Sequence, residues 1–160
     1  MDPLPIPLLP AISWMAQLSP EERARLGSYG SIITLPPEKF LIQEGEPQPY
    51  FYFVIKGMLS VRRKSRGQDL IVAVVCGGES LGEMTMVTRG SATASVIGLE
   101  DTQLWRIHQE DFMKFIQEEP VTGNKILLSI ISLLSDRLIA VKSDLATLLS
   151  QRRENFSHEG

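Results

Sequence analysis

The chain has 160 residues, of which 43% are hydrophobic and 22% charged, and its formal net charge is −3. These values are typical of one soluble globular domain that can bury most of the apolar surface of its unfolded form. A slightly acidic chain does not favour nucleic-acid binding, which normally needs a basic surface. A single cysteine, Cys76, excludes an intramolecular disulfide framework.

No apolar run approaches the roughly 18 residues that a membrane-crossing helix needs. The first five residues hold an acid and two prolines where a signal peptide would be basic. We therefore expect a cytoplasmic protein with no membrane partner.

The N-terminal segment divides into an arm and a helix. Prolines alternate with apolar residues over residues 1–10, which favours an extended arm at 1–13. Ser19-Pro20-Glu21-Glu22 then has the serine, the first-turn proline and the glutamate of a capping box. With apolar residues before it (Trp14, Met15 and Leu18) and Leu26 after it, this pattern predicts one or two short helices that end at Gly27 and Gly30.

Short apolar or alternating runs, bounded by turn glycines, recur about every ten residues in the middle of the chain. They are Ser31–Leu35, Lys39–Gln43, Tyr50–Lys56, Met58–Arg63, Leu70–Cys76, Ala94–Leu99 and Gln103–Ile107. This rhythm predicts an antiparallel β-sandwich or barrel. The basic residues Arg62 to Arg66 fall at the tip of a predicted hairpin, where they are either a solvated turn or a contact for a phosphate or a partner.

The C-terminal part has helical periodicity. Asp111 to Glu119 predicts a short amphipathic helix that turns Phe112, Phe115 and Ile116 inward and stops at Pro120. A longer helix at 121–152 follows, with 153–160 as a disordered tail. Its apolar residues alternate spacings of four and three over three heptads: Leu127, Ile131, Leu134, Leu138, Val141, Leu145 and Leu148.

This heptad stripe has two interpretations: a helix along the core of its own domain, or the interface of a parallel homodimer. A second apolar set, which includes Ile126 and Ile130, lies on the first half of the same helix. One face can therefore serve the domain and the other a partner. Seven apolar side chains at roughly 1.5–3 kcal/mol each are too much surface to leave in water. We expect the homodimer.

A glycine-containing segment, residues 82–96, joins two of the predicted strands. Gly78 to Val87 leads from a strand into an expected single helical turn, and Ser91 to Val96 returns to a strand. Small residues, backbone N–H groups at a helix start and one carboxylate, Glu83, form a plausible cradle for an anion that carries hydroxyls.

In combination, these features resemble the cyclic-nucleotide-binding domain family, which includes catabolite-activator regulators, kinase regulatory subunits and gated channels. The resemblance covers roughly residues 14–145 and rests on Gly45, Tyr52–Gly57, Gly78, Leu81-Gly82-Glu83, Ala94-Ser95-Val96, Leu104, Ile107 and Phe112. It implies a mainly β fold: an antiparallel, jelly-roll-like β-roll at 14–120 with short N-terminal helices, followed by a long hinge and dimerisation helix. Ligand would lie between the roll and that helix.

The resemblance also assigns the ligand-binding residues. Glu83 would bind the ribose 2′-hydroxyl, with Gly82 and the amides of Met84 and Thr85 near the phosphate. Glu83 has a second interpretation as a cap of the turn. The arginine that pairs with the cyclic phosphate in the family falls at Ala92, and the next position is Thr93.

The absence of that arginine bears on affinity, because a charge-assisted hydrogen bond is worth about 1.5–3 kcal/mol. Its loss would weaken binding of cyclic AMP or cyclic GMP by about two orders of magnitude or more. Arg89, three residues earlier, is a candidate replacement. Three alternatives stay open: an empty pocket, a different ligand, or a pocket filled by the protein's own side chains.

Nothing in the sequence indicates an enzyme. His108, His158 and Cys76 form no recognisable metal site or nucleophilic triad. Residues 151–160 are too few for a helix-turn-helix, so we do not expect direct DNA binding.

Two functions follow from these observations. One is a dimeric regulatory or sensor domain with altered or lost affinity for cyclic AMP, cyclic GMP or a related ligand. The other is a ligand-independent interaction module, in which the roll is a scaffold and the C-terminal helix docks on another signalling protein. A third interpretation is a sensor domain cut from a larger regulator. The sensing function would then be the same, and only its downstream output would differ.

Overall fold

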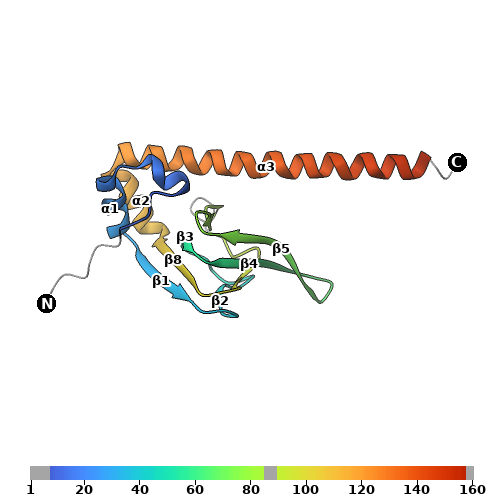
Figure 1. Cartoon of the computed structure of the whole chain (residues 1–160), viewed down its shortest axis with the longest axis horizontal. Helices are drawn as coiled ribbons and strands as arrows, with labels where there is room; N and C mark the ends of the chain where they lie inside the picture. Colours follow the sequence, from blue (N-terminus) through green and yellow to red (C-terminus); the bar gives the residue numbers. More distant parts are fainter. Residues whose placement is uncertain (1–7, 85–89, 158–160) are drawn as a thin grey trace. The chain divides into compact units, whose positions relative to one another are not determined.

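The structure is a computed structural model that describes residues 8–84 and 90–157 (Figure 1). The chain forms two compact units, residues 1–124 and residues 125–160. The first unit contains two short N-terminal helices, two β-sheets and a third helix. The second unit is helical.

Two antiparallel four-stranded sheets form the β-roll, which confirms the predicted fold class. The strands are β1 (Ser31–Leu35), β2 (Phe40–Ile42), β3 (Tyr50–Lys56), β4 (Met58–Ser65), β5 (Gln68–Cys76), β6 (Ser80–Leu81), β7 (Ser95–Gly98) and β8 (Thr102–His108). The first sheet has the order β1-β8-β3-β6 and the second the order β2-β7-β4-β5. All seven predicted strands are present, and β6 was not predicted.

Alternation along the strands gives the first sheet two apolar faces. Its inner face packs on the second sheet around Tyr52, Val54 and Leu104, which are buried together with residues of β4, β5 and β7. Its outer face turns Phe51, Phe53 and other aromatic residues away from that core. The roll therefore has an inner core between the sheets and a second core on its outer side.

Helices complete the second core. They are η1 (Ser13–Gln17), α1 (Pro20–Ser28) and α2 (Gln109–Glu118). Trp14 packs edge-on against Phe53 with 5.6 Å between ring centroids and donates a hydrogen bond to Ser80 Oγ over 2.9 Å. Phe112 of α2 stacks near Phe51, and the predicted capping box at Ser19 and Glu22 is present at the start of α1.

The last helix, α3 (Pro120–Ser157), differs from the prediction at both ends. Pro120 begins α3 because proline fits the first turn of a helix, where no hydrogen-bonded N–H is needed. The helix also continues past residue 152 into the expected tail, since Gln151, Arg152 and Glu154 are good helix formers. Thr122 Oγ1 donates a 3.0 Å hydrogen bond to the buried Glu22, which ties the start of α3 to α1.

The basic stretch also differs in detail. Residues 62–65 lie on strand β4, and only Arg66, with Gly67, forms the turn to β5. Both turn residues have positive φ, as a two-residue hairpin turn requires.

Candidate functional site

The glycine-containing segment begins directly after β6, at the edge of the first sheet. Leu81 pairs with Tyr52 of β3, and Gly82 follows with φ of +78°. A Cβ at Gly82 would lie 2.4 Å from the carbonyl oxygen of Tyr50, so only glycine allows the chain this close to β3. The close approach places Glu83 in a buried position, with 6% of its surface exposed.

The segment returns to the sheet at Ala92. The Gly45 amide donates to the Ala92 carbonyl and the Ala92 amide to the Glu46 carbonyl, both over 2.8 Å, and Ser91 forms a β-bridge with Pro47. The loop between β2 and β3 therefore fixes the backbone of this position. Its side chain is a buried methyl group that can supply no charge to an anion.

The structure brings some of the predicted ligand-binding residues into one segment and leaves others undescribed. Gly82 lies against β3 and its preceding loop, Ala92 is hydrogen-bonded to that loop, and Glu83 is buried. Met84 and Thr93 are exposed. Thr85 and Arg89 lie outside the described residues, as does most of the expected helical turn.

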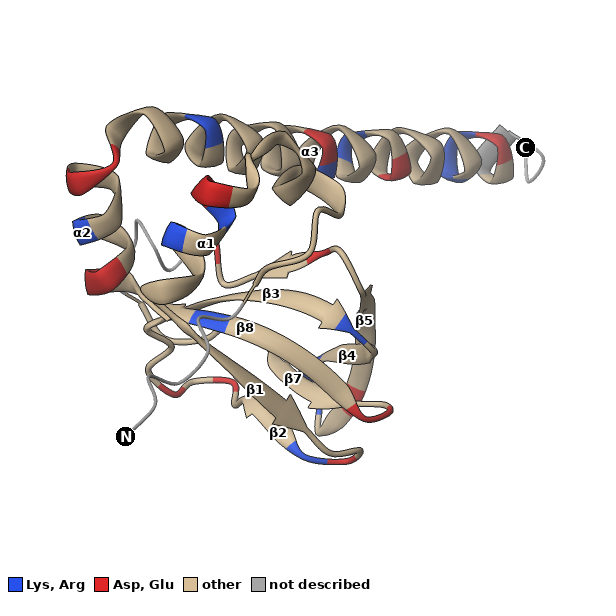
Figure 2. Cartoon of the chain, turned by 60° about the vertical axis from the view of Figure 1, so that its left-hand side comes forward, with Lys and Arg blue, Asp and Glu red and all other residues tan. Residues whose placement is uncertain are grey.

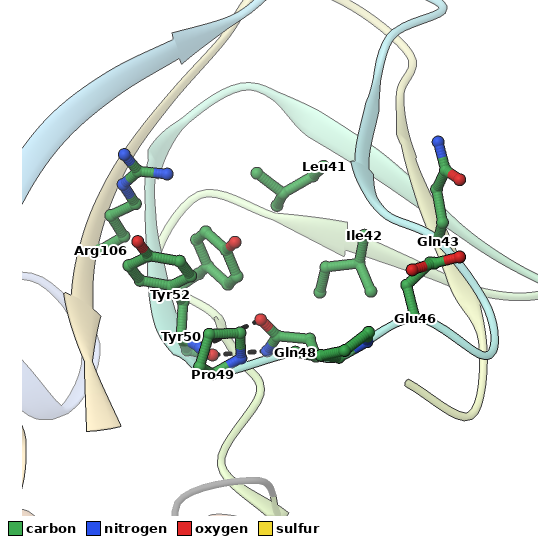
Figure 3. A pocket seen from close by; sticks show the side chains of 10 residues that line it. Leu41, Ile42, Gln43, Glu46, Gln48, Pro49, Tyr50, Tyr52 and Arg106 are labelled. Carbon is green, nitrogen blue, oxygen red and sulfur yellow. Dashed lines mark hydrogen bonds between the residues drawn. The ribbon is translucent and has the colours of Figure 1, made fainter. Parts of the chain in front are cut away.

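A pocket of about 320 Å³ lies beside this segment, on the other side of the β2–β3 loop (Figure 3). Its lining consists of Leu41, Ile42, Gln43, Glu46, Pro47, Gln48, Pro49, Tyr50, Tyr52 and Arg106. Burial raises the pKa of the Tyr52 phenol to about 12, and the charge of Arg106 with its hydrogen bond opposes that rise. Tyr52 is therefore a neutral phenol at physiological pH.

Sequence reasoning did not single out Arg106. A signal was present, because side chains two apart on a strand share a face and Leu104 is an inward residue of the family pattern. Arg106 therefore has to point inward from the same strand.

The predicted dimer interface lies on α3 as a run of exposed apolar side chains. Ile131, Leu138, Val141, Leu145 and Leu148 each expose between 55% and 63% of their surface, Leu127 exposes 36%, and Leu134 is partly buried. Figure 2 shows acidic and basic residues interspersed with them along the helix. The stripe has the heptad spacing of a coiled coil and is uncovered in the single chain.

Within the described ranges 8–84 and 90–157, no helix is long and apolar enough to cross a membrane. The same ranges contain no group of three histidine, cysteine or acidic side chains placed to hold a metal ion.

Comparison with known proteins identifies the class. The sequence model of the "cyclic nucleotide-binding domain" matches residues 32–119, which is more than half of the chain. The chain belongs to the cyclic nucleotide-binding domain family. The family explains both the roll and the glycine-containing segment, and it confirms the resemblance inferred from the sequence.

Individual relatives are regulators and isolated domains of this fold. The chain is 28% identical to the cyclic AMP receptor protein of Thermus thermophilus, with 86% of this chain and 62% of that protein aligned. The structure of the T. thermophilus catabolite activator protein superimposes with a TM-score of 0.73 at 28% identity, covering 84% of this chain and 62% of the other.

A cyclic nucleotide-binding domain of Methylobacillus flagellatus gives a TM-score of 0.72 at 26% identity, over 76% of this chain and 68% of that one.

The chain spans 62% of the Thermus cyclic AMP receptor protein, which is less than two thirds of its length. Some matched proteins are enzymes: a Bradyrhizobium glutaminase is 25% identical, but only 21% of its length is aligned. The chain is a cyclic-nucleotide-binding-type regulatory domain.

Proposed function

We propose that this chain is a dimeric regulatory domain whose affinity for cyclic AMP and cyclic GMP is altered or lost. The observation that carries the proposal is the buried methyl group of Ala92, fixed by two backbone hydrogen bonds at the position where the family pattern has its phosphate-binding arginine. The segment keeps the close turn at Gly82 and the buried carboxylate of Glu83. It therefore retains its ribose side and lacks the charge on its phosphate side.

The energetic consequence follows from burial. A phosphate in a partly buried cradle needs charged or hydrogen-bonding partners, and each charge-assisted bond contributes about 1.5–3 kcal/mol. Backbone amides at the turn supply some of this stabilisation without the arginine. The expected result is weak binding, or a preference for a ligand with less charge.

Dimerisation through α3 accounts for the exposed heptad stripe. A parallel coiled coil would bury the side chains from Leu127 to Leu148 and remove a long apolar surface from water. The ligand would act by favouring one arrangement of the helices over another, which requires a difference in its affinity for the two.

Calorimetry tests the ligand. We expect cyclic AMP and cyclic GMP to bind the full chain with dissociation constants of about 10 µM or weaker. Glu83→Ala should weaken the binding further, with Glu83→Gln as the control that keeps the shape of the side chain. Micromolar or tighter binding that Glu83→Ala leaves unchanged would contradict both the lowered affinity and the role of Glu83.

Analytical ultracentrifugation tests the dimer. Leu138→Glu places a charge in the centre of the heptad stripe and should yield monomers, whereas Ser143→Glu, at an exposed f position on the opposite face of the helix, should leave the dimer intact. A dimer that survives Leu138→Glu would locate the interface elsewhere.

A ligand-independent interaction module is the second candidate, favoured by apolar side chains that the heptad stripe does not include. Leu128, Ile139 and Leu149 expose between 55% and 67% of their surface on α3. Ile139 in particular lies away from the stripe, on a face that another signalling protein could contact. In that case Leu138→Glu and Ile139→Glu would affect separate associations.

A further inference from the structure

Arg106 occupies a central position on the inner face of the first sheet. It pairs with Tyr52 of β3 on one side and with Ser31 of β1 on the other, and Tyr52 in turn pairs with Leu81 of β6. Side chains of directly paired residues project from the same face of a sheet. Tyr52 and Leu81 belong to the inner core, so Arg106 also projects inward.

The charge of Arg106 is held mainly by aromatic groups. Its guanidinium lies 4.6 Å from the centre of the Tyr50 ring, and its charge also acts on the Tyr52 phenol, whose pKa it lowers. Where the structure describes the chain, no carboxylate forms an ion pair with it. A guanidinium has five N–H donors in a planar fork, and a ring face and one phenol oxygen leave several of them for a ligand.

The pocket around Arg106 has a graded lining. Figure 3 shows Arg106 and the two tyrosines at one end, Gln43 and Glu46 at the other, and the apolar side chains of Leu41 and Ile42 between them. Its volume of about 320 Å³ suits a small organic molecule. The carboxylate of Glu46 disfavours a second anionic group at the far end.

The wall of the pocket is preformed. The side chain of Gln48 hydrogen-bonds the backbone of Tyr50 in both directions, as donor to its carbonyl and acceptor from its amide. The same loop is bonded to Ala92 through Gly45 and Glu46. A ligand in the pocket therefore does not have to order the loop, and it would contact the loop that also fixes the glycine-containing segment.

We propose that this pocket binds a compact organic anion, whose phosphate or carboxylate group pairs with Arg106 and whose apolar body packs on Leu41 and Ile42. Of the described residues in the glycine-containing segment, none lines the pocket. The site is therefore separate from the one proposed for a cyclic nucleotide, and its occupancy does not depend on that function.

The test is titration of the ¹⁵N-labelled full chain, followed by NMR, with phenyl phosphate, benzoate and the uncharged benzyl alcohol. At least one anion should give saturable shifts at Leu41, Ile42, Tyr50 and Arg106, and benzyl alcohol should bind at least about tenfold more weakly, since it lacks the charge-assisted bonds. The anion that binds more tightly identifies a phosphate or a carboxylate as the preferred group.

Substitutions test whether the guanidinium of Arg106 binds the anion. Arg106→Gln should weaken the anion at least about tenfold, whereas Arg62→Gln, which removes a cation from strand β4, should not. Glu83→Ala should leave anion binding unchanged even where it abolishes cyclic nucleotide binding. Arg106→Met keeps the apolar stem over Tyr50 and replaces Arg106→Gln if that variant does not fold.

Three results would overturn the proposal: neither anion binds at about 10 mM, benzyl alcohol binds as tightly as the anions, or the Arg106 variants retain full affinity. Shifts confined to the glycine-containing segment would place the ligand there and overturn it as well.

Discussion

Hydrogen bonds to the β2–β3 loop fix the backbone of Ala92 through both its amide and its carbonyl. A longer side chain at this position would therefore extend from a Cα whose position is already fixed. We predict that Ala92→Arg raises the affinity for cyclic AMP or cyclic GMP by about tenfold to a hundredfold, because it adds a charge-assisted contact to the phosphate. Calorimetry measures the change.

Ala92→Gln is the matched control for this prediction, since glutamine has a comparable reach without the charge. It should give a much smaller gain. Equal affinities of the parent chain and Ala92→Arg would mean that position 92 does not face the phosphate.

Two glycines with almost the same φ allow the cost of backbone strain to be separated from the cost of a steric clash. Gly82 has φ of +78° and Gly67 has φ of +77°, but a Cβ at Gly82 would lie 2.4 Å from the Tyr50 carbonyl oxygen, and one at Gly67 would meet nothing within 4 Å. Gly67→Ala should cost about 1–2 kcal/mol of unfolding free energy, from the left-handed backbone alone.

Gly82→Ala should cost more than Gly67→Ala, because β3 and the segment must also move apart. Urea unfolding of the two variants gives the difference. Equal losses would show that the segment yields to the added methyl group, and that it does not depend on the close approach to β3.

At the scale of elements, α3 carries charges beside its apolar stripe. In the heptad register, Ile131, Leu138 and Leu145 are a positions and Val141 is a d position, so Arg137 is a g and Lys142 the following e position. A parallel dimer brings g of one helix next to this e of its partner. The parent sequence therefore places two like charges together, on each side of the interface.

We predict that Arg137→Glu and Lys142→Glu each tighten the dimer, because either one converts this repulsion into an attraction. Two such pairs at about 0.2–1 kcal/mol each amount to a change of about twofold to thirtyfold in the dissociation constant. The measurement is sedimentation equilibrium at low salt, where screening is weakest.

The double variant, with glutamate at both positions, restores a like-charge pair and should return the dissociation constant close to its parent value. In an antiparallel dimer these two positions do not face each other in this way. Additive effects of the two substitutions would therefore exclude the parallel arrangement.

At the scale of the whole molecule, periodicity predicted most of the fold. The run Tyr50–Lys56 and the run Ser31–Leu35 match β3 and β1 residue for residue, because a glycine or a proline lies directly before and directly after each apolar run. Strand β6 was missed since two residues, Ser80 and Leu81, are too few to show a period. Its existence depends on pairing with β3, which is a tertiary contact.

The candidate site likewise has one part that the sequence predicts and another that depends on tertiary contacts. The assignment of Glu83 and Ala92 follows from the resemblance of one continuous segment to the family pattern, which the sequence alone can show. The environment of Arg106 depends on the register of three strands and on the position of Tyr50, which is distant in sequence. The spacing of two residues from Leu104 indicates which face Arg106 occupies, but the side chains that it meets there follow only from the strand pairing.

The last prediction concerns the coupling of folding to association. The long α3 exposes its apolar stripe in the single chain, so association would stabilise the folded state by mass action. We predict that the midpoint of thermal unfolding rises with protein concentration, by a few degrees over a hundredfold range, because a domain of this size shifts by about 2–4 °C per kcal/mol. Calorimetric scans across that range measure it.

Leu138→Glu provides the control, since its midpoint should be lower at high concentration and independent of concentration throughout. A parent chain whose midpoint does not change with concentration, while sedimentation reports a dimer, would mean that the dimer dissociates only after unfolding has begun or that it does not stabilise the fold. In either case the folding of the roll would not be coupled to association through α3, which would contradict the prediction.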